Sequence, residues 1–460
     1  MKPRHAAGVV LTIALAAIAS ARVGEPRRAE ANASVATRTP AEAAPRFEDV
    51  RAEIERRASE AEVLAEVSSE SWGRQTSAAT LNLQLAGLTG DWARYESADR
   101  FVGLATAAAR ARGATESRGP LLARAELDYA LHRFAKVLVD LEPVTSDALR
   151  GGNDELLAQT KALEGATRVA LGEYDRGQGL LREAATLDPE RSSHRQRLAV
   201  ALVKTGDFDE AVDIFARAEA AAPAGRGRAW LALQRGLVEM ERGRFPVARA
   251  HLARASRELP GWWLVDEHLA ELDAAEGRHA EAEAALRSLV PRTGDPEHMD
   301  ALAELVRARG EEKEAAALEA RARAVHEARL AKLPEAAAGH AVEHFLRVEH
   351  DPARTVALAE KNREVRPDGE ASTHLAQAYL CAGRVADARK EIDLVLATRW
   401  SSGETFATAA VVFARAGDAA RAASMRAAAL ARNPRAMSDV AWLDARAPLR
   451  SEVEHEGARR

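Results

Sequence analysis

The segment His340-Ala341-Val342-Glu343-His344 has the residue types and spacing that could hold a metal ion. On a helix, His340 and His344 would present two imidazoles on one face, one turn apart, with the Glu343 carboxylate beside them. Such a set can bind zinc and activate a water molecule. The pattern therefore raises, as the alternative function, a zinc-dependent hydrolase that uses residues 340–344. No recognisable downstream motif supplies a third ligand, so we predict no enzymatic activity, no cofactor and no metal.

The same helix face could instead contact a partner. His340, His344 and Arg347 are spaced i, i+4 and i+7, and the equivalent positions 33 residues later hold Thr373 and Gln377. Trp230 begins a helix of its own, and tryptophan is enriched in binding hot spots. Two plainer interpretations stay open: the face is merely solvated, and the tryptophan packs between repeats. The predicted partner-binding groove comprises His340, His344, Arg347, Thr373, Gln377 and Trp230.

Composition favours helix throughout the chain. Hydrophobic residues make up 47% of the 460 residues and aromatic residues only 4%, so the apolar positions are mostly alanine and small aliphatic side chains. Alanine loses no side-chain entropy in a helix, whereas a sheet would need β-branched and aromatic runs. The net charge of −5 lacks the basic excess of a nucleic-acid binder, so we predict no nucleic-acid partner.

A repeat of about 34 residues decides the fold class. Glycine turns recur at 172, 206, 243, 277, 310, 383 and 417, and weaker units surround Gly90-Asp91-Trp92 and His132-Arg133-Phe134. Alanine and an aromatic residue follow the turn at fixed offsets, as in Ala211 and Phe215 after Gly206. Five units place a proline 17 residues after the turn: Pro189, Pro223, Pro260, Pro367 and Pro434. Regular spacing of this kind indicates stacked supersecondary units rather than one globular core.

This pattern resembles the tetratricopeptide repeat (TPR). The resemblance implies an all-α, right-handed superhelical solenoid of about ten TPR-like helix pairs. It also implies a protein–protein interaction scaffold that binds a segment of a partner protein in its concave groove. Small residues such as Gly165 and Gly236 would let the first helix of a pair approach its partner closely.

The two ends of the chain differ from the repeats. Residues 1–21 carry a basic start, an apolar run and Ala19-Ser20-Ala21, which predicts a signal peptide cleaved after Ala21 and a periplasmic or secreted protein. An uncleaved anchor is the alternative; after cleavage we expect no stable membrane span. We predict a disordered linker over 22–46, irregular helix pairs over 47–150, the regular solenoid over 151–446 and a charged tail over 447–460.

Overall fold

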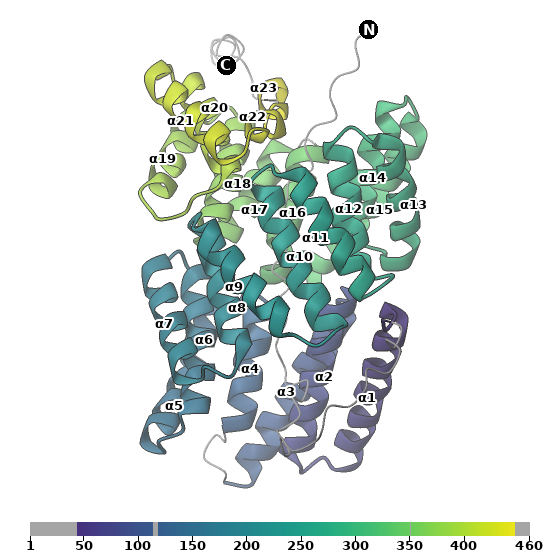
Figure 1. Ribbon diagram of the computed structural model, residues 1–460, viewed down its shortest axis with the longest axis vertical. Helices are drawn as coiled ribbons and strands as arrows, with labels where there is room; N and C mark the ends of the chain where they lie inside the picture. The colour runs from purple at the N-terminus through teal and green to yellow at the C-terminus, as the bar shows by residue number, and fades with distance from the viewer. Residues whose placement is uncertain (1–43, 114–117, 350, 447–460) are drawn as a thin grey trace.

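The computed structural model describes residues 44–113, 118–349 and 351–446, and every regular element in these ranges is a helix (Figure 1). The predicted signal peptide, most of the predicted linker and the predicted tail lie outside the described residues. None of the helices described is both long and apolar enough to cross a membrane.

Consecutive helices pack as antiparallel pairs, and α2 to α21 form the ten predicted pairs, preceded by α1 and followed by two short helices. The predicted all-α superhelical solenoid is therefore confirmed. The first eleven helices are α1 (Phe47–Val67), α2 (Trp72–Thr89), α3 (Ala93–Ala111), α4 (Arg118–Ala130), α5 (Phe134–Arg150), α6 (Asp154–Ala170), α7 (Tyr174–Leu187), α8 (Ser192–Lys204), α9 (Phe208–Ala221), α10 (Arg226–Glu241) and α11 (Phe245–Glu258). The others are α12 (Trp263–Ala275), α13 (His279–Thr293), α14 (Pro296–Ala308), α15 (Glu312–Lys332), α16 (Pro334–His344), the π-helix η1 (Phe345–Glu349), α17 (Pro352–Val365), α18 (Gly369–Cys381), α19 (Val385–Leu396), α20 (Gly403–Arg415), α21 (Ala419–Arg432), α22 (Ala436–Asp439) and α23 (Trp442–Arg446).

The turns that the structure describes within the pairs have the backbone that the repeat pattern predicts. All seven glycines of the regular repeat have positive φ, between 66° and 91°. In the weaker unit before α5 the same position is held by His132, the one non-glycine residue with positive φ among those described (56°). The five repeat prolines each lie two residues beyond the end of a second helix, where a proline cannot continue the helix.

Two glycines show why the first helix of a pair carries a small residue. A Cβ at Gly165 would lie 2.8 Å from the carbonyl oxygen of Gly177, and one at Gly236 would lie 2.9 Å from the Leu252 side chain. Both distances are shorter than a real Cβ contact. These glycines therefore set how closely α6 approaches α7 and α10 approaches α11.

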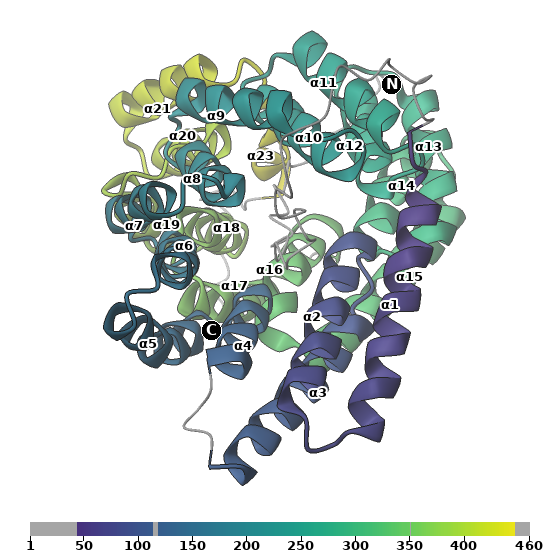
Figure 2. The ribbon, with the colours of Figure 1, turned by 60° about the horizontal axis from the view of Figure 1, so that its bottom comes forward.

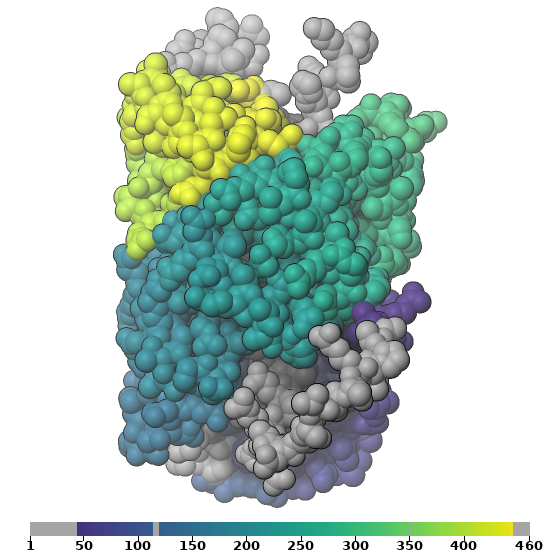
Figure 3. All heavy atoms as spheres, viewed as in Figure 1, coloured from purple at the N-terminus to yellow at the C-terminus, as the bar shows by residue number. Residues whose placement is uncertain are grey.

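The solenoid coils back onto itself. Seen from below, the helices are arranged in a ring, and α18 to α21 lie beside α6 to α9 (Figure 2). The surfaces of these later and earlier helices meet directly in the space-filling view (Figure 3). Hydrogen bonds join residues 175 to 226 positions apart: Trp263 Nε1 to the Leu88 oxygen, the Gly369 amide to the Tyr174 hydroxyl, and Arg432 to the Gly206 oxygen.

We call this line of contact the seam. It joins turns within earlier pairs to connections between later pairs. Its turns are residues 88–92, 172–174, 204–207 and 241–243, and its later loops are residues 260–263, 366–370, 398–403 and 432–434.

Close packing at the seam gives the turn glycines a second role. A Cβ at Gly172 would lie 2.6 Å from the Pro367 oxygen, and a Cβ at Gly243 would lie 2.6 Å from Asn433 Oδ1. A larger residue at either turn would therefore push two coils apart in addition to straining the backbone.

Buried charges also cross the seam. Lys204 at the end of α8 donates to Glu370 at 3.0 Å, and Arg366 donates to the same carboxylate at 2.8 Å. Arg366 also bonds Asp368 at 3.1 Å. Burial alone would raise the pKa of Glu370, but Arg366 and Lys204 outweigh it and hold the pKa well below its usual value. Glu370 therefore stays ionised within the contact.

A second seam carboxylate behaves in the opposite way and gives a pH prediction. Glu241 accepts a hydrogen bond from the Gly403 amide at 3.4 Å. Burial raises its pKa to about 7, with a further rise from Glu404, while Gly403, Lys204 and Arg432 act against the shift. The folded state therefore retains a proton that the unfolded chain releases near pH 4.3.

The stability that depends on protonated Glu241 is therefore fully present below about pH 4.3 and is lost as the pH rises through about 7. Between pH 5 and pH 8 we expect the free energy of unfolding of the wild type to fall by about 1–3 kcal/mol relative to Glu241→Gln. Chemical denaturation of both proteins across this range measures the difference. Parallel pH profiles for the two proteins would contradict the prediction.

Candidate functional site

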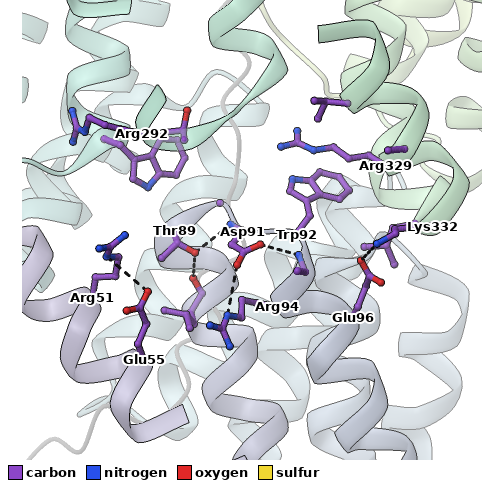
Figure 4. Close-up of a pocket in the computed structure, with 18 of the residues that line it drawn as sticks. Arg51, Glu55, Thr89, Asp91, Trp92, Arg94, Glu96, Arg292, Arg329 and Lys332 are labelled. Carbon is purple, nitrogen blue, oxygen red and sulfur yellow. Dashed lines mark hydrogen bonds and ion pairs between the residues drawn. The ribbon is translucent and has the colours of Figure 1, made fainter. Parts of the chain in front are cut away.

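A pocket of about 630 Å³ lies beside the seam, between α1 to α3 on one side and α12, α13 and α15 on the other (Figure 4). It is within the size range of sites that enclose a small ligand or a few side chains. The residues that line it are Phe47, Glu48, Arg51, Glu55, Leu85, Thr89, Gly90, Asp91, Trp92, Ala93, Arg94, Glu96, Trp263, Arg292, Thr293, Ala324, Val325, Ala328, Arg329, Lys332 and Leu333.

Two tryptophans form much of the apolar lining, and local backbone geometry positions both. Gly90 turns the chain with φ of 69°, and Asp91 Oδ1 accepts the Ala93 amide at 3.0 Å, which fixes Trp92 at the start of α3. Trp263 at the start of α12 packs against Gly90, where a Cβ would lie 3.3 Å from its ring. The Gly-Asp-Trp turn of the sequence therefore builds one wall of the pocket.

The charged lining consists of ion pairs. The guanidinium of Arg329 lies 4.6 Å from the centre of the Trp92 ring and pairs with Asp295 at 3.1 Å. On the rim, Lys332 pairs with Glu96 at 2.8 Å, and Arg51 pairs with Glu48 at 2.7 Å. Five cations and four carboxylates line the pocket in total. A ligand with both positive and negative groups could replace the ion pairs on the rim. Each side chain of a pair would then keep an opposite charge beside it.

The two histidines of the 340–344 motif do not share a ligand position. His340 Nδ1 is hydrogen-bonded to Glu297, whereas His344 Nδ1 lies 2.8 Å from Asp300 Oδ2. Burial lowers the pKa of His340, but the charge and hydrogen bond of Glu297 outweigh it and raise the pKa above its usual value. Its ring stands edge-on to Trp92, with centres 6.0 Å apart, so His340 supports the pocket from behind.

Three of the six predicted groove residues are buried, which corrects the expectation that they are exposed. His344, Thr373 and Gln377 are each 1–2% exposed. Thr373 Oγ1 lies 2.7 Å from Thr405 Oγ1, and Gln377 donates to Thr408 at 3.0 Å. These side chains connect the first helix of one pair to the first helix of a neighbouring pair. Their hydrogen bonds allow polar side chains to be buried at these positions.

The other three are partly exposed. His340 lies behind the pocket as described, the Arg347 guanidinium lies 5.4 Å from the centre of the Trp442 ring, and Trp230 stands edge-on to Phe215 with centres 6.0 Å apart. A role for them in partner binding stays a prediction. The pocket itself was missed from the sequence because it forms between residues 47–96 and residues 263–333, which are far apart along the chain.

A group of metal-ligating side chains does occur among the described residues, but with a different membership. It comprises Asp300, His326 and His344, whose candidate ligand atoms all lie within 4.8 Å of one another. His340 and Glu343 are not part of it.

Fold and site together define a helix-pair solenoid with a pocket between its coils. Residues 168–236 match the family model described as "Tetratricopeptide repeat". No curated protein matches the chain.

Similar solved structures include a tetratricopeptide repeat protein from Parabacteroides merdae, with 15% identity and a TM-score of 0.38, over 50% of this chain and 87% of that one. Another is the human IFIT1 dimer with PPP-AAAA, with 13% identity and a TM-score of 0.44, over 84% and 94% of the two chains. A third is the APC/C hetero-tetramer Cut9-Hcn1, with 12% identity and a TM-score of 0.36, over 87% and 94%.

Proposed function

We propose that the protein is a non-catalytic scaffold that binds a segment of a partner protein in the pocket between α1 to α3 and α12 to α15. One observation carries this proposal: the pocket combines two tryptophans with five cations and four carboxylates. Aromatic and arginine side chains dominate the energetics of protein interfaces.

The chemistry of the lining describes the segment that would fit. Trp92, Trp263 and Leu333 offer apolar surface for one or two anchoring side chains. Lys332 and Arg51, with 61% and 43% of their side chains exposed, can bind carboxylates of the segment. The exposed acids Glu96 and Glu55 can bind its basic residues. Because the two signs nearly balance, a peptide with both charges suits the pocket better than a polyanion such as nucleic acid.

Export belongs to the same proposal. The signal-peptide pattern of residues 1–21 supports a periplasmic or secreted location, where a preformed pocket could hold an envelope or extracellular protein. Binding on a preorganised solenoid would lose little ordering entropy on the scaffold side.

The test is a peptide selection followed by a variant comparison. Peptides selected from a random library on the full chain are synthesised, and their Kd values are measured for the wild type and for Arg51→Glu/Lys332→Glu. Both substituted side chains are exposed and lie on the pocket rim, so the fold should persist. We expect binding of the selected peptide to weaken at least tenfold, because each substitution places a glutamate where the wild type offers a cation to the carboxylates of the peptide.

The matched control is Arg150→Glu/Arg217→Glu, which reverses two exposed charges away from the pocket, 73% and 69% exposed. It should leave Kd within about twofold. Hydrogen exchange should show protection by the peptide at residues 89–96 and 324–333. Equal Kd values for rim and control variants, or protection elsewhere only, would refute the pocket as the binding site.

A further inference from the structure

Two histidines and two carboxylates converge in the interior where α14, α15 and α16 meet. Asp300 comes from α14, His326 from α15 and His344 from the last position of α16. Asp300 Oδ2 lies 2.8 Å from His344 Nδ1 and 3.7 Å from His326 Nε2. The centres of the two imidazole rings are 4.8 Å apart. This cluster lies outside the pocket lining and is independent of the proposed partner binding.

Three atoms of the cluster are buried without a hydrogen-bond partner: Asp300 Oδ1, His326 Nε2 and His344 Nε2. His326 and His344 are only 1% and 2% exposed. Buried polar atoms are almost always hydrogen-bonded, because an unpaired one retains the cost of losing its water. All three atoms belong to side chains that can ligate a metal ion.

The π-helix η1 brings a second carboxylate to the other nitrogen of His344. Residues i and i+5 share a face in a π-helix, whereas an α-helix would turn them about 140° apart. Glu349 is five residues after His344, and its Oε1 lies 3.6 Å from His344 Nε2. Arg323 holds the same carboxylate from the outside at 3.2 Å. Single-turn π-helices frequently mark functional sites.

We propose that Asp300, His326 and His344 form a site for a divalent cation of the zinc type. Two imidazoles and one carboxylate are ligands that suit zinc, and water completes the four-coordinate shell. His344 binds through Nδ1, the nitrogen that faces Asp300, and His326 binds through its unpaired Nε2. Glu349 lies at the other nitrogen of His344 and orients that ring without being a ligand itself. The bound ion ties α14, α15 and α16 together.

The first test is metal uptake by the full chain, made without a histidine tag and stripped with a chelator. Titration with Zn²⁺ should load one equivalent and raise Tm by several degrees, since the ion binds only the folded state. Co²⁺ in its place should give the intense visible absorption of tetrahedral coordination. Uptake well below one equivalent with no change in Tm overturns the proposal, and the cluster is then a metal-free imidazole–carboxylate network.

The second test identifies the residues that hold the ion, either as ligands or by orienting a ligand. His326→Gln and Glu349→Gln should each weaken Zn²⁺ binding at least tenfold. The matched control is His268→Gln, which replaces a buried histidine paired with Glu271 on α12 and should bind Zn²⁺ as the wild type does. His340→Gln should also retain the ion. Loss of the ion in His340→Gln but not in His326→Gln would assign the metal to the 340–344 motif and overturn this ligand set.

Discussion

Replacing Arg366 with methionine is expected to lower the free energy of unfolding by about 3–5 kcal/mol. Its guanidinium bonds Asp368 at 3.1 Å and Glu370 at 2.8 Å within the seam, and its side chain is only 16% exposed. Methionine fills much of the same volume but leaves Asp368 buried without its counter-charge. A lone buried charge is far more costly than a missing pair. Urea denaturation followed by circular dichroism measures the loss.

The control for this variant is Arg384→Met. Arg384 pairs with Asp387 at 2.7 Å, but both side chains are about 45% exposed, and such pairs contribute about 0–1 kcal/mol. The double variant Arg366→Met/Asp368→Asn should recover part of the lost stability, because it removes the unpaired charge. If Arg366→Met and Arg384→Met were equally stable, the seam charges would contribute no more than a surface pair.

Trp400→Ala is expected to destabilise the protein by about 3–5 kcal/mol. The ring is 8% exposed and donates from Nε1 to Thr405 Oγ1 at 2.8 Å. The centre of the ring lies 5.0 Å from the ammonium of Lys204 and 6.1 Å from the ring of Tyr174, both of which belong to the earlier coil. Removing the ring opens a cavity at the seam and removes the aromatic face against which the Lys204 ammonium packs. Thermal and urea denaturation should both report the loss.

Two variants distinguish loss of the ring from general damage to the region. Trp400→Phe keeps an aromatic ring but loses the bond to Thr405, so a smaller loss of about 1–2 kcal/mol is expected. Leu394→Ala truncates a nearby side chain that is 48% exposed and should cost under about 1 kcal/mol. A Trp400→Ala protein as stable as Leu394→Ala would mean that the ring does not hold the coils together.

The local parts of this fold could be predicted from the sequence because each has a short-range physical cause. Positive φ at Gly206, the close approach at Gly165 and the helix end before Pro223 all depend on residues within one helix pair. His132 shows that the position matters more than the residue type, since it adopts the same backbone as the glycines.

The contacts between coils could not be predicted, because nothing in a 34-residue period reports which turns meet 175 residues later. The burial of three predicted groove residues could not be predicted for a related reason. Thr373 and Gln377 looked exposed because they are polar, yet hydrogen bonds to α20 allow them to be buried. His340 and His344 do lie one turn apart on the α-helix α16, but Glu297 and Asp300 hold them separately, and Glu349 reaches His344 only through the π-helix η1 that follows.

Arrays in which each repeat contacts only its neighbours can stretch elastically and lose repeats from an end one at a time. The bonds from Tyr174 to Gly369 and from Gly206 to Arg432 remove that freedom here. The coil is therefore closed on itself, and a stretching force must break these bonds before the coil can extend. Deletion of α18 to α23 would therefore loosen α6 to α9, although the deleted helices are far away in sequence. Unfolding should consequently be one cooperative transition across the two coils.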